Sequence, residues 1–160
     1  MRKSIASDEK GEFMTRENVE NVRRLFQAVE ERDIAGVLAA YAPNIVICDA
    51  ESLPYGGVYR GLEGAKQHIE GAAQTWNHLQ PSAQRKMDAV FLDAGDYIVV
   101  LWRLKGLAAS SGRKLDSPTV SVYKMRDGKI VESQMFYADT VAIGQFLESD
   151  LHFAHSASPT

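Results

Sequence analysis

The stretch that decides the fold is residues 33–61, DIAGVLAAYAPNIVICDAESLPYGGVYRG. Asp33 can cap a short helix over residues 34–41, because its side-chain oxygen can accept a hydrogen bond from an unpaired amide of the first turn. The β-branched run at 45–49 predicts a strand that ends on Asp49, and the Pro and Gly residues after it predict a loop. We therefore expect the functional site to form around the carboxyl group of Asp49.

Longer helices are predicted on both sides of this stretch. Apolar residues recur every three or four positions from Thr15 onward and again over residues 62–76, which is the period of a helix with one buried face. Thr15 can cap the first of these helices. Residues 1–13 have no such period and precede Met14, so we expect a flexible leader there.

The second half of the chain has the pattern of an antiparallel sheet. Turn residues separate four predicted strands, at 82–92, 97–107, 114–125 and 130–137. A short closing helix is expected over 138–147. The domain then covers residues 14–148, with a flexible tail at 149–160. This order predicts an α+β fold in which a cone-shaped, curved antiparallel sheet wraps around the long N-terminal helix, with two further helices.

Composition excludes several classes of protein. The chain has 160 residues, 45% of them apolar, which suffices for one domain with a real core. Its net charge of -3 and scattered basic residues argue against nucleic-acid binding. There is no apolar run of about 20 residues for a membrane span and no apolar signal segment, and Cys48 has no partner for a disulfide, so we expect a cytoplasmic protein. No metal or cofactor is expected, and the expected partner is a small hydrophobic molecule.

Strand alternation predicts which side chains face the inside of the cone. Successive side chains of a strand point to opposite faces, so Asp49 shares its face with every second residue of its strand. Extending this rule to the other strands predicts an apolar cavity with a few hydroxyl groups, formed by Ile45, Ile47, Asp49, Val100, Trp102, Leu104, Thr119, Ser121, Tyr123, Val131, Ser133, Met135 and Tyr137.

Several short pieces of the sequence together resemble a known family. They are Arg32-Asp33-Ile34 before Tyr41-Ala42, the strand that ends at Asp49, LPYGG at 53–57, GVYRG at 57–61, RDGKI at 126–130 and YADT at 137–140. Their order and spacing are similar to the SnoaL-like and ketosteroid isomerase-like proteins of the nuclear transport factor 2 superfamily. The resemblance implies a cone-shaped fold, a deep apolar pocket and a homodimer joined through the sheet. It implies no single activity, because one fold hosts isomerases, cyclases, dehydratases, epoxide hydrolases and binding modules.

The catalytic residues of that superfamily match this chain only in part. Asp49 lies where ketosteroid isomerases have their general base. Their tyrosine donor falls at Leu25 or Phe26, and their protonated acid falls near Ser121, so both of those donors are missing.

Other enzymes of the superfamily match less well. The Asp, Arg, Asp set of the epoxide hydrolases falls near Trp102, Leu104 and Met135 or Phe136, and the last predicted strand has no acid before Asp139 where polyketide cyclases have one.

Asp49 is the predicted general base, because burial in an apolar cavity brings a carboxyl group toward proton exchange near neutral pH. Tyr137, Ser121 or Tyr55 would donate to the enolate oxygen that develops when a proton beside a carbonyl is removed. The other predicted substrate contacts are Tyr59, Trp76, Trp102, Thr119, Ser133 and Met135. The alternative for Asp49 is a solvated side chain at the strand end or a cap for the loop.

Three neighbouring residues have structural interpretations. Asp139 is expected to cap the closing helix rather than act as a second acid. His68 is expected to be exposed, and Cys48 is expected to pack on the opposite face of its strand.

Three functions remain open at this point. The first is a cofactor-independent enzyme of the isomerase, cyclase or dehydratase type acting on a hydrophobic carbonyl or polyketide-like compound. The second is a non-catalytic protein that binds a small hydrophobic ligand. The third is a dimerisation module without a ligand. In each case we expect a homodimer, because Val99, Leu101 and Arg103 form a partly apolar outer face of the sheet.

Overall fold

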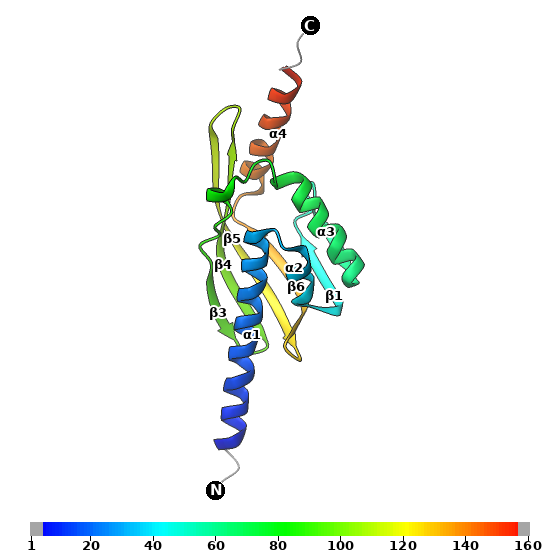
Figure 1. Cartoon of the computed structure of the whole chain (residues 1–160), viewed down its shortest axis with the longest axis vertical. Coiled ribbons are helices and arrows are strands. Elements are labelled where there is room, and N and C mark those ends of the chain that lie inside the picture. The colour runs from blue at the N-terminus through cyan, green and yellow to red at the C-terminus, as the bar shows by residue number, and fades with distance from the viewer. Residues whose placement is uncertain (1–4, 157–160) are drawn as a thin grey trace.

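The computed structural model describes the backbone of residues 5–156 and the side chains of residues 16–149. Its elements, drawn in Figure 1, are α1 (Ile5–Glu31), α2 (Ile34–Ala39), β1 (Tyr41–Asp49), β2 (Gly57–Arg60), α3 (Gly61–Trp76), a 3-10 turn (Ser82–Gln84), β3 (Val90–Ala94), β4 (Tyr97–Ala108), β5 (Arg113–Arg126), β6 (Lys129–Tyr137) and α4 (Thr140–Ser156). Within the described part of the chain, no helix is long and apolar enough to cross a membrane.

The strands form one sheet in the order β2-β1-β6-β5-β4-β3. Helices α1, α2 and α3 lie over one face of this sheet (Figure 1), and the predicted α+β fold is confirmed. One strand pair differs from the prediction, because β1 runs parallel to β6 while the other neighbouring strands are antiparallel. The alternation of side chains is the same in both kinds of pair, so the sequence pattern could not distinguish them.

Both terminal helices are longer than predicted. α1 begins at Ile5 rather than at Thr15, so residues 5–13 of the predicted leader are helical. Their charged residues are adequate helix formers even where no apolar stripe marks a buried face. α4 extends from Thr140 to Ser156, so the closing helix expected over 138–147 continues through residues 149–156 of the predicted tail. Residues 1–4 and 157–160 lie outside the described residues, and the flexibility of both ends stays a prediction.

Two internal boundaries also differ. The predicted strand at 82–92 is wrong over residues 82–89, since β3 begins only at Val90. The carbonyl of Met87, just before β3, accepts a hydrogen bond from the N–H of Arg103 on β4 at 2.8 Å. The N–H of Met87 donates to the carboxylate of Glu30 on α1 at 3.0 Å, so contacts with two elements hold this segment. Residues 42–44, predicted to end α2, lie in β1.

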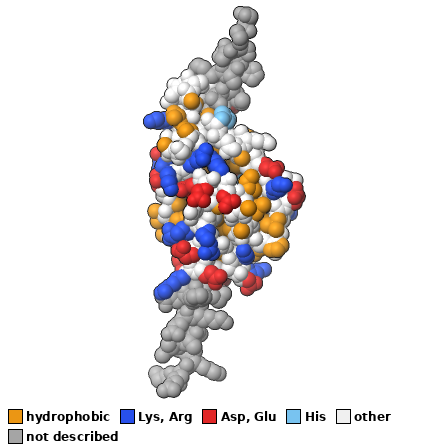
Figure 2. All heavy atoms as spheres, viewed as in Figure 1, with side chains coloured by type: hydrophobic (Ala, Val, Ile, Leu, Met, Phe, Trp, Pro, Cys, Tyr) orange, Lys and Arg blue, Asp and Glu red, His pale blue; other side chains and the backbone are white. Residues whose placement is uncertain are grey.

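α1 packs its apolar stripe against the concave face of the sheet. Val22 is fully buried there, and Phe26 makes edge-to-face contacts with three aromatic rings, those of Phe91, Trp102 and Tyr123, at centroid distances of 5.4, 6.0 and 6.2 Å. The outward face of the helical layer carries acidic and basic side chains interspersed with apolar ones (Figure 2). The sheet and α1 are thus joined by apolar burial, which is the main stabilising term in such a packing.

A second apolar cluster closes the other end of the cone. Trp76, at the end of α3, stacks on Phe146 of α4 with a centroid distance of 6.2 Å, and Ile143 is fully buried beside them. Asp139 accepts a hydrogen bond from the N–H of Ala142 at 2.9 Å, so its predicted role as a helix cap is confirmed. On the near side of this cluster, residues of α1, α2 and α3 line a space over the sheet.

The predicted alternation of inward side chains is confirmed for the strands around that space. Ile45, Ile47 and Asp49 of β1 are all buried, as are Ser121 and its neighbours at every second position of β5. Cys48 lies on the other face of β1 and is half-buried.

Candidate functional site

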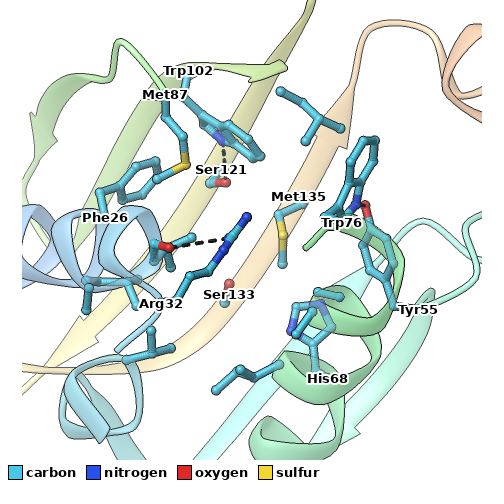
Figure 3. Close-up of a pocket in the computed structure, with 18 of the residues that line it drawn as sticks. Phe26, Arg32, Tyr55, His68, Trp76, Met87, Trp102, Ser121, Ser133 and Met135 are labelled. Atoms are coloured by element: carbon cyan, nitrogen blue, oxygen red, sulfur yellow. Dashed lines mark hydrogen bonds between the residues drawn. The ribbon is translucent and has the colours of Figure 1, made fainter. Parts of the chain in front are cut away.

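A cavity of about 250 Å³ lies between the concave face of the sheet and helices α1 and α3. Its walls are mostly apolar, with Phe26, Met87 and Trp102 on one side and Trp76 on the other (Figure 3). Small-molecule sites in proteins typically have volumes of about 300–1,000 Å³, so this cavity lies just below that range.

Eight of the ten site residues predicted from the sequence line this cavity. They are Asp49, Tyr55, Trp76, Trp102, Ser121, Ser133, Met135 and Tyr137. The other two are placed elsewhere. Thr119 is buried and its hydroxyl group contacts the backbone oxygen of Ser117 at 3.4 Å, while the hydroxyl group of Tyr59 donates to the backbone oxygen of Tyr55 at 2.9 Å. Tyr59 therefore supports the loop that carries Tyr55 rather than the cavity surface.

Asp49 forms a buried pair with a residue that was not among the predicted site residues. Its Oδ2 lies 2.8 Å from Nε2 of His68 on α3, and its Oδ1 accepts the N–H of Ala50 at 2.8 Å. The carboxyl group has no exposed surface and the imidazole side chain is 11% exposed. Asp49 is therefore neither solvated nor merely a cap, because one oxygen holds the following backbone and the other holds the imidazole ring.

The prediction that His68 is exposed is wrong. His68 follows Ala65 by three positions and precedes Ala72 by four, so it lies on the inward stripe of α3, whereas Leu62 is exposed. The rings of Tyr55 and Tyr59 contact its imidazole at centroid distances of 6.1 and 5.1 Å. The spacing from Ala65 to His68 is a signal that could have found this residue, because positions three apart share a helix face.

Two tyrosines surround the Asp49–His68 pair. Tyr55 accepts a hydrogen bond from Nε1 of Trp76 at 2.9 Å. Burial raises the pKa of Tyr55, and the negative charge of Asp49 raises it further. Burial also raises the pKa of Tyr137, with contributions from Tyr55 and Asp49. Both phenols therefore stay protonated near neutral pH and are hydrogen-bond donors beside the acid.

Two buried serines on neighbouring strands differ in their contacts. Ser121 accepts a hydrogen bond from Nε1 of Trp102 at 2.9 Å (Figure 3), and its hydroxyl group also interacts with the phenol of Tyr123. Ser133 is equally buried, but its Oγ has no hydrogen-bond partner among the described residues. Ser133 therefore presents an unsatisfied hydroxyl group at the cavity wall.

Arg32 is the second functional side chain that sequence reasoning missed. It follows the last residue of α1 and lines the same cavity, where its guanidinium contacts the side-chain oxygen of Gln80 (Figure 3). Burial lowers the pKa of Arg32, and the neighbouring charge of Arg85 lowers it further. The sequence showed only that Arg32 precedes the cap Asp33, which does not reveal where its side chain points.

No metal site is evident in the part of the chain that the structure describes, since no three His, Cys, Asp or Glu side chains there come together as ligands. The cavity instead has a buried acid and imidazole pair, phenol and hydroxyl donors, and the guanidinium groups of Arg32, Arg85 and Arg103 at its wall. Such a set can exchange a proton with a bound molecule and stabilise negative charge on its oxygen atoms.

Comparisons with known proteins agree with this architecture. A structure of TerC co-crystallised with polyporic acid has a TM-score of 0.70 and 23% identity, covering 82% of this chain and 98% of the other. An NTF2-like protein of unknown function from Burkholderia pseudomallei K96243 has a TM-score of 0.67 and 26% identity, with coverages of 82% and 97%.

A protein from Jannaschia sp. CCS1 assigned as a SnoaL-like polyketide cyclase has a TM-score of 0.60 and 22% identity, with coverages of 89% and 94%. A search among curated proteins finds no sequence match. The sequence model of the SnoaL-like domain, however, matches residues 22–133, which include β1, α3 and most of the cavity wall. The chain therefore belongs to the SnoaL-like domain family within the nuclear transport factor 2-like fold.

Proposed function

We propose that this protein is a cofactor-independent enzyme that transfers protons on a small, mostly apolar carbonyl compound, in a reaction of the isomerase, cyclase or dehydratase type. The observation that carries the proposal is the buried contact of 2.8 Å between Asp49 and His68 at the wall of an apolar cavity. Two titratable groups held together in a cavity are a common arrangement for general acid–base catalysis.

The proposed roles follow from the contacts. The Asp49–His68 pair takes the proton from the carbon beside the carbonyl, the electron pair of that C–H bond forms the C=C bond of the enolate, and the π electron pair of the carbonyl moves onto its oxygen. Tyr55 or Tyr137 donates a hydrogen bond to this oxygen, and Ser121 is a third donor on the same wall. The pair then returns the proton to a different atom of the substrate. General acid–base catalysis of this kind contributes about 10²–10⁴-fold in rate.

A binding protein without catalysis is the second candidate. It is favoured by the positions of Phe26 and Ser121, where ketosteroid isomerases have their two oxyanion donors. The co-crystallisation of TerC with polyporic acid supports a small-molecule ligand in either case. The two candidates differ in whether the bound molecule leaves the cavity unchanged.

Proton exchange in D2O distinguishes these functions. We expect the protein to catalyse the loss of protons beside the carbonyl in one or more members of a panel of small aromatic and alicyclic ketones, followed by proton NMR. Replacing Asp49 by asparagine should lower the exchange rate about 10²–10⁴-fold. A matched control is Asp93→Asn, because Asp93 is an exposed acid beside the turn between β3 and β4 and does not line the cavity. Ketones that bind to the wild-type protein but exchange no protons would favour the binding protein, and an unchanged rate in Asp49→Asn would contradict the base assignment.

We also propose that two copies associate through the outer face of the sheet. Leu101 is 44% exposed on β4, and its register neighbour Val90 on β3 is 53% exposed. On the other side of Leu101, Val120 leads to Phe136 of β6, which is 49% exposed. This apolar row spans four adjacent strands, and a second copy could cover it. Light scattering should report a dimer at micromolar concentration, and Leu101→Lys should shift it toward a monomer.

A further inference from the structure

Arg32 occupies a backbone position that ordinarily favours glycine. Its φ is 62°, in the left-handed region, because it is the first residue after the C-terminal end of α1. The N–H of Asp33 donates to the carbonyl of Ala28 at 2.8 Å, and the N–H of Arg32 donates to the carbonyl of Val29 at 3.2 Å, which is the Schellman arrangement. The sequence thus has a long cationic side chain at a position where glycine would adopt the backbone conformation with less strain.

The guanidinium of Arg32 is only partly satisfied by its neighbours. Nη2 donates to the side-chain oxygen of Gln80, and Nη1 approaches the carbonyl of Val29 at 3.4 Å. Nε is buried without a hydrogen-bond partner among the described residues. A guanidinium has five N–H donors, so at least part of its binding capacity remains available to a molecule in the cavity.

No carboxylate that lines the cavity neutralises this charge. Asp49 is paired with His68, and Asp33 accepts the N–H of Gly36 at 3.0 Å as the cap of α2. The structure shows no ion pair of Arg32 within residues 16–149. A partly buried cation without a counter-ion is costly, and a second cation, Arg85, lines the same cavity.

We propose that the cavity binds a small carboxylic acid whose carboxylate contacts Arg32, with the free hydroxyl group of Ser133 as a further hydrogen-bond donor. The planar guanidinium matches the two oxygens of a carboxylate better than it matches any neutral group. In Figure 3, Arg32 enters the cavity from the α1 side and His68 from the α3 side, with Ser133 and Met135 also at its wall. The apolar walls would surround the rest of the ligand.

This inference rests on the proposed function and narrows it, because it assigns the substrate to the carbonyl compounds that also carry a carboxylate. The carboxylate would be held at Arg32, and the carbon that loses its proton would face the Asp49–His68 pair. The sequence predicts a small hydrophobic molecule as the ligand, but the charge of the cavity wall is a local property that the net charge of -3 does not describe.

Binding of matched acids and amides tests the proposal without any catalytic step. The probes are benzoate, phenylacetate and cyclohexanecarboxylate, each compared with its primary amide by isothermal titration calorimetry. We expect the wild-type protein to bind at least one of these acids about tenfold or more tightly than its amide, since hydrogen bonds to charged groups are stronger than those between neutral groups. Arg32→Gly should abolish this preference, and Arg32→Lys should retain part of it.

The control variants separate this proposal from the catalytic one. Arg24→Gln removes the same charge from an exposed position of α1 and should leave the preference unchanged. Asp49→Asn should also retain the preference, so a failure of the proton-exchange experiment leaves the carboxylate site standing. Equal affinity for acids and amides, a preference that survives in Arg32→Gly, or no measurable binding of any acid at millimolar concentration would each overturn the proposal. Circular dichroism confirms that Arg32→Gly is folded, which we expect because glycine adopts its backbone conformation readily.

Discussion

Two buried serines of the cavity wall should respond to alanine substitution with opposite changes in stability. Ser133 is 2% exposed and its Oγ has no hydrogen-bond partner among the described residues, so Ser133→Ala removes an unsatisfied polar group. Burying an unpaired hydroxyl costs about 1–3 kcal/mol in protein mutational data. We therefore expect Ser133→Ala to raise the free energy of unfolding by about 1 kcal/mol.

Ser121→Ala is the matched comparison. Ser121 is fully buried on the neighbouring strand, but its Oγ accepts a hydrogen bond from Nε1 of Trp102 at 2.9 Å. Removing this acceptor leaves the indole N–H of Trp102 without its partner, which costs about 1–3 kcal/mol. The same chemical change should thus lower the stability here, and the two variants should differ by about 2–4 kcal/mol.

Urea unfolding followed by circular dichroism measures both variants, at one protein concentration because any association contributes to the apparent stability. In a domain of this size, 1 kcal/mol corresponds to a shift of about 2–4 °C in Tm, so thermal unfolding gives an independent value. A loss of stability in both variants would refute the reasoning, since it would mean that Ser133 has a hydrogen-bond partner that stabilises the fold. The m-values should be unchanged, because neither substitution alters the surface that unfolding exposes.

Three further substitutions test other parts of the structure. Gly106→Ala should lower stability by about 1–2 kcal/mol in urea unfolding, because an added Cβ would lie 2.8 Å from the buried ring of Phe146 and would displace it. Asp139→Ala should lower it by about 1 kcal/mol, because it removes the cap that holds the N–H of Ala142; Asp139→Asn should retain most of the effect. Arg32→Gly should change Tm by only a few degrees, because relief of the left-handed backbone, worth about 1–2 kcal/mol, offsets the lost contact with Gln80; a large drop would mean that the guanidinium is a structural group.

The parts of the site that the sequence predicted are those that a fixed geometry places. A strand turns its side chains alternately to two faces, so the position of Asp49 on β1 determined that Ile47 shares its face, and the same rule placed Ser121 and Ser133. Turn residues likewise located the three turns that join β3 to β4, β4 to β5 and β5 to β6. This regularity is why most of the predicted cavity residues do line the cavity.

The rest was decided by tertiary contacts. His68 reaches Asp49 only because α3 is rotated so that Ala65 rather than Leu62 is buried, and a weakly apolar helix does not reveal that rotation in its sequence. Arg32 enters the cavity because α1 ends in a left-handed turn.

By itself, then, the sequence determined the α+β fold, the faces of the strands and the place of one acid, because these depend on periodic local geometry. Only the tertiary structure decided what that acid contacts, which of two similar serines is unsatisfied, and that a cation lines the apolar cavity. These features depend on how separate elements meet in space, and no local pattern records the relative position of two helices.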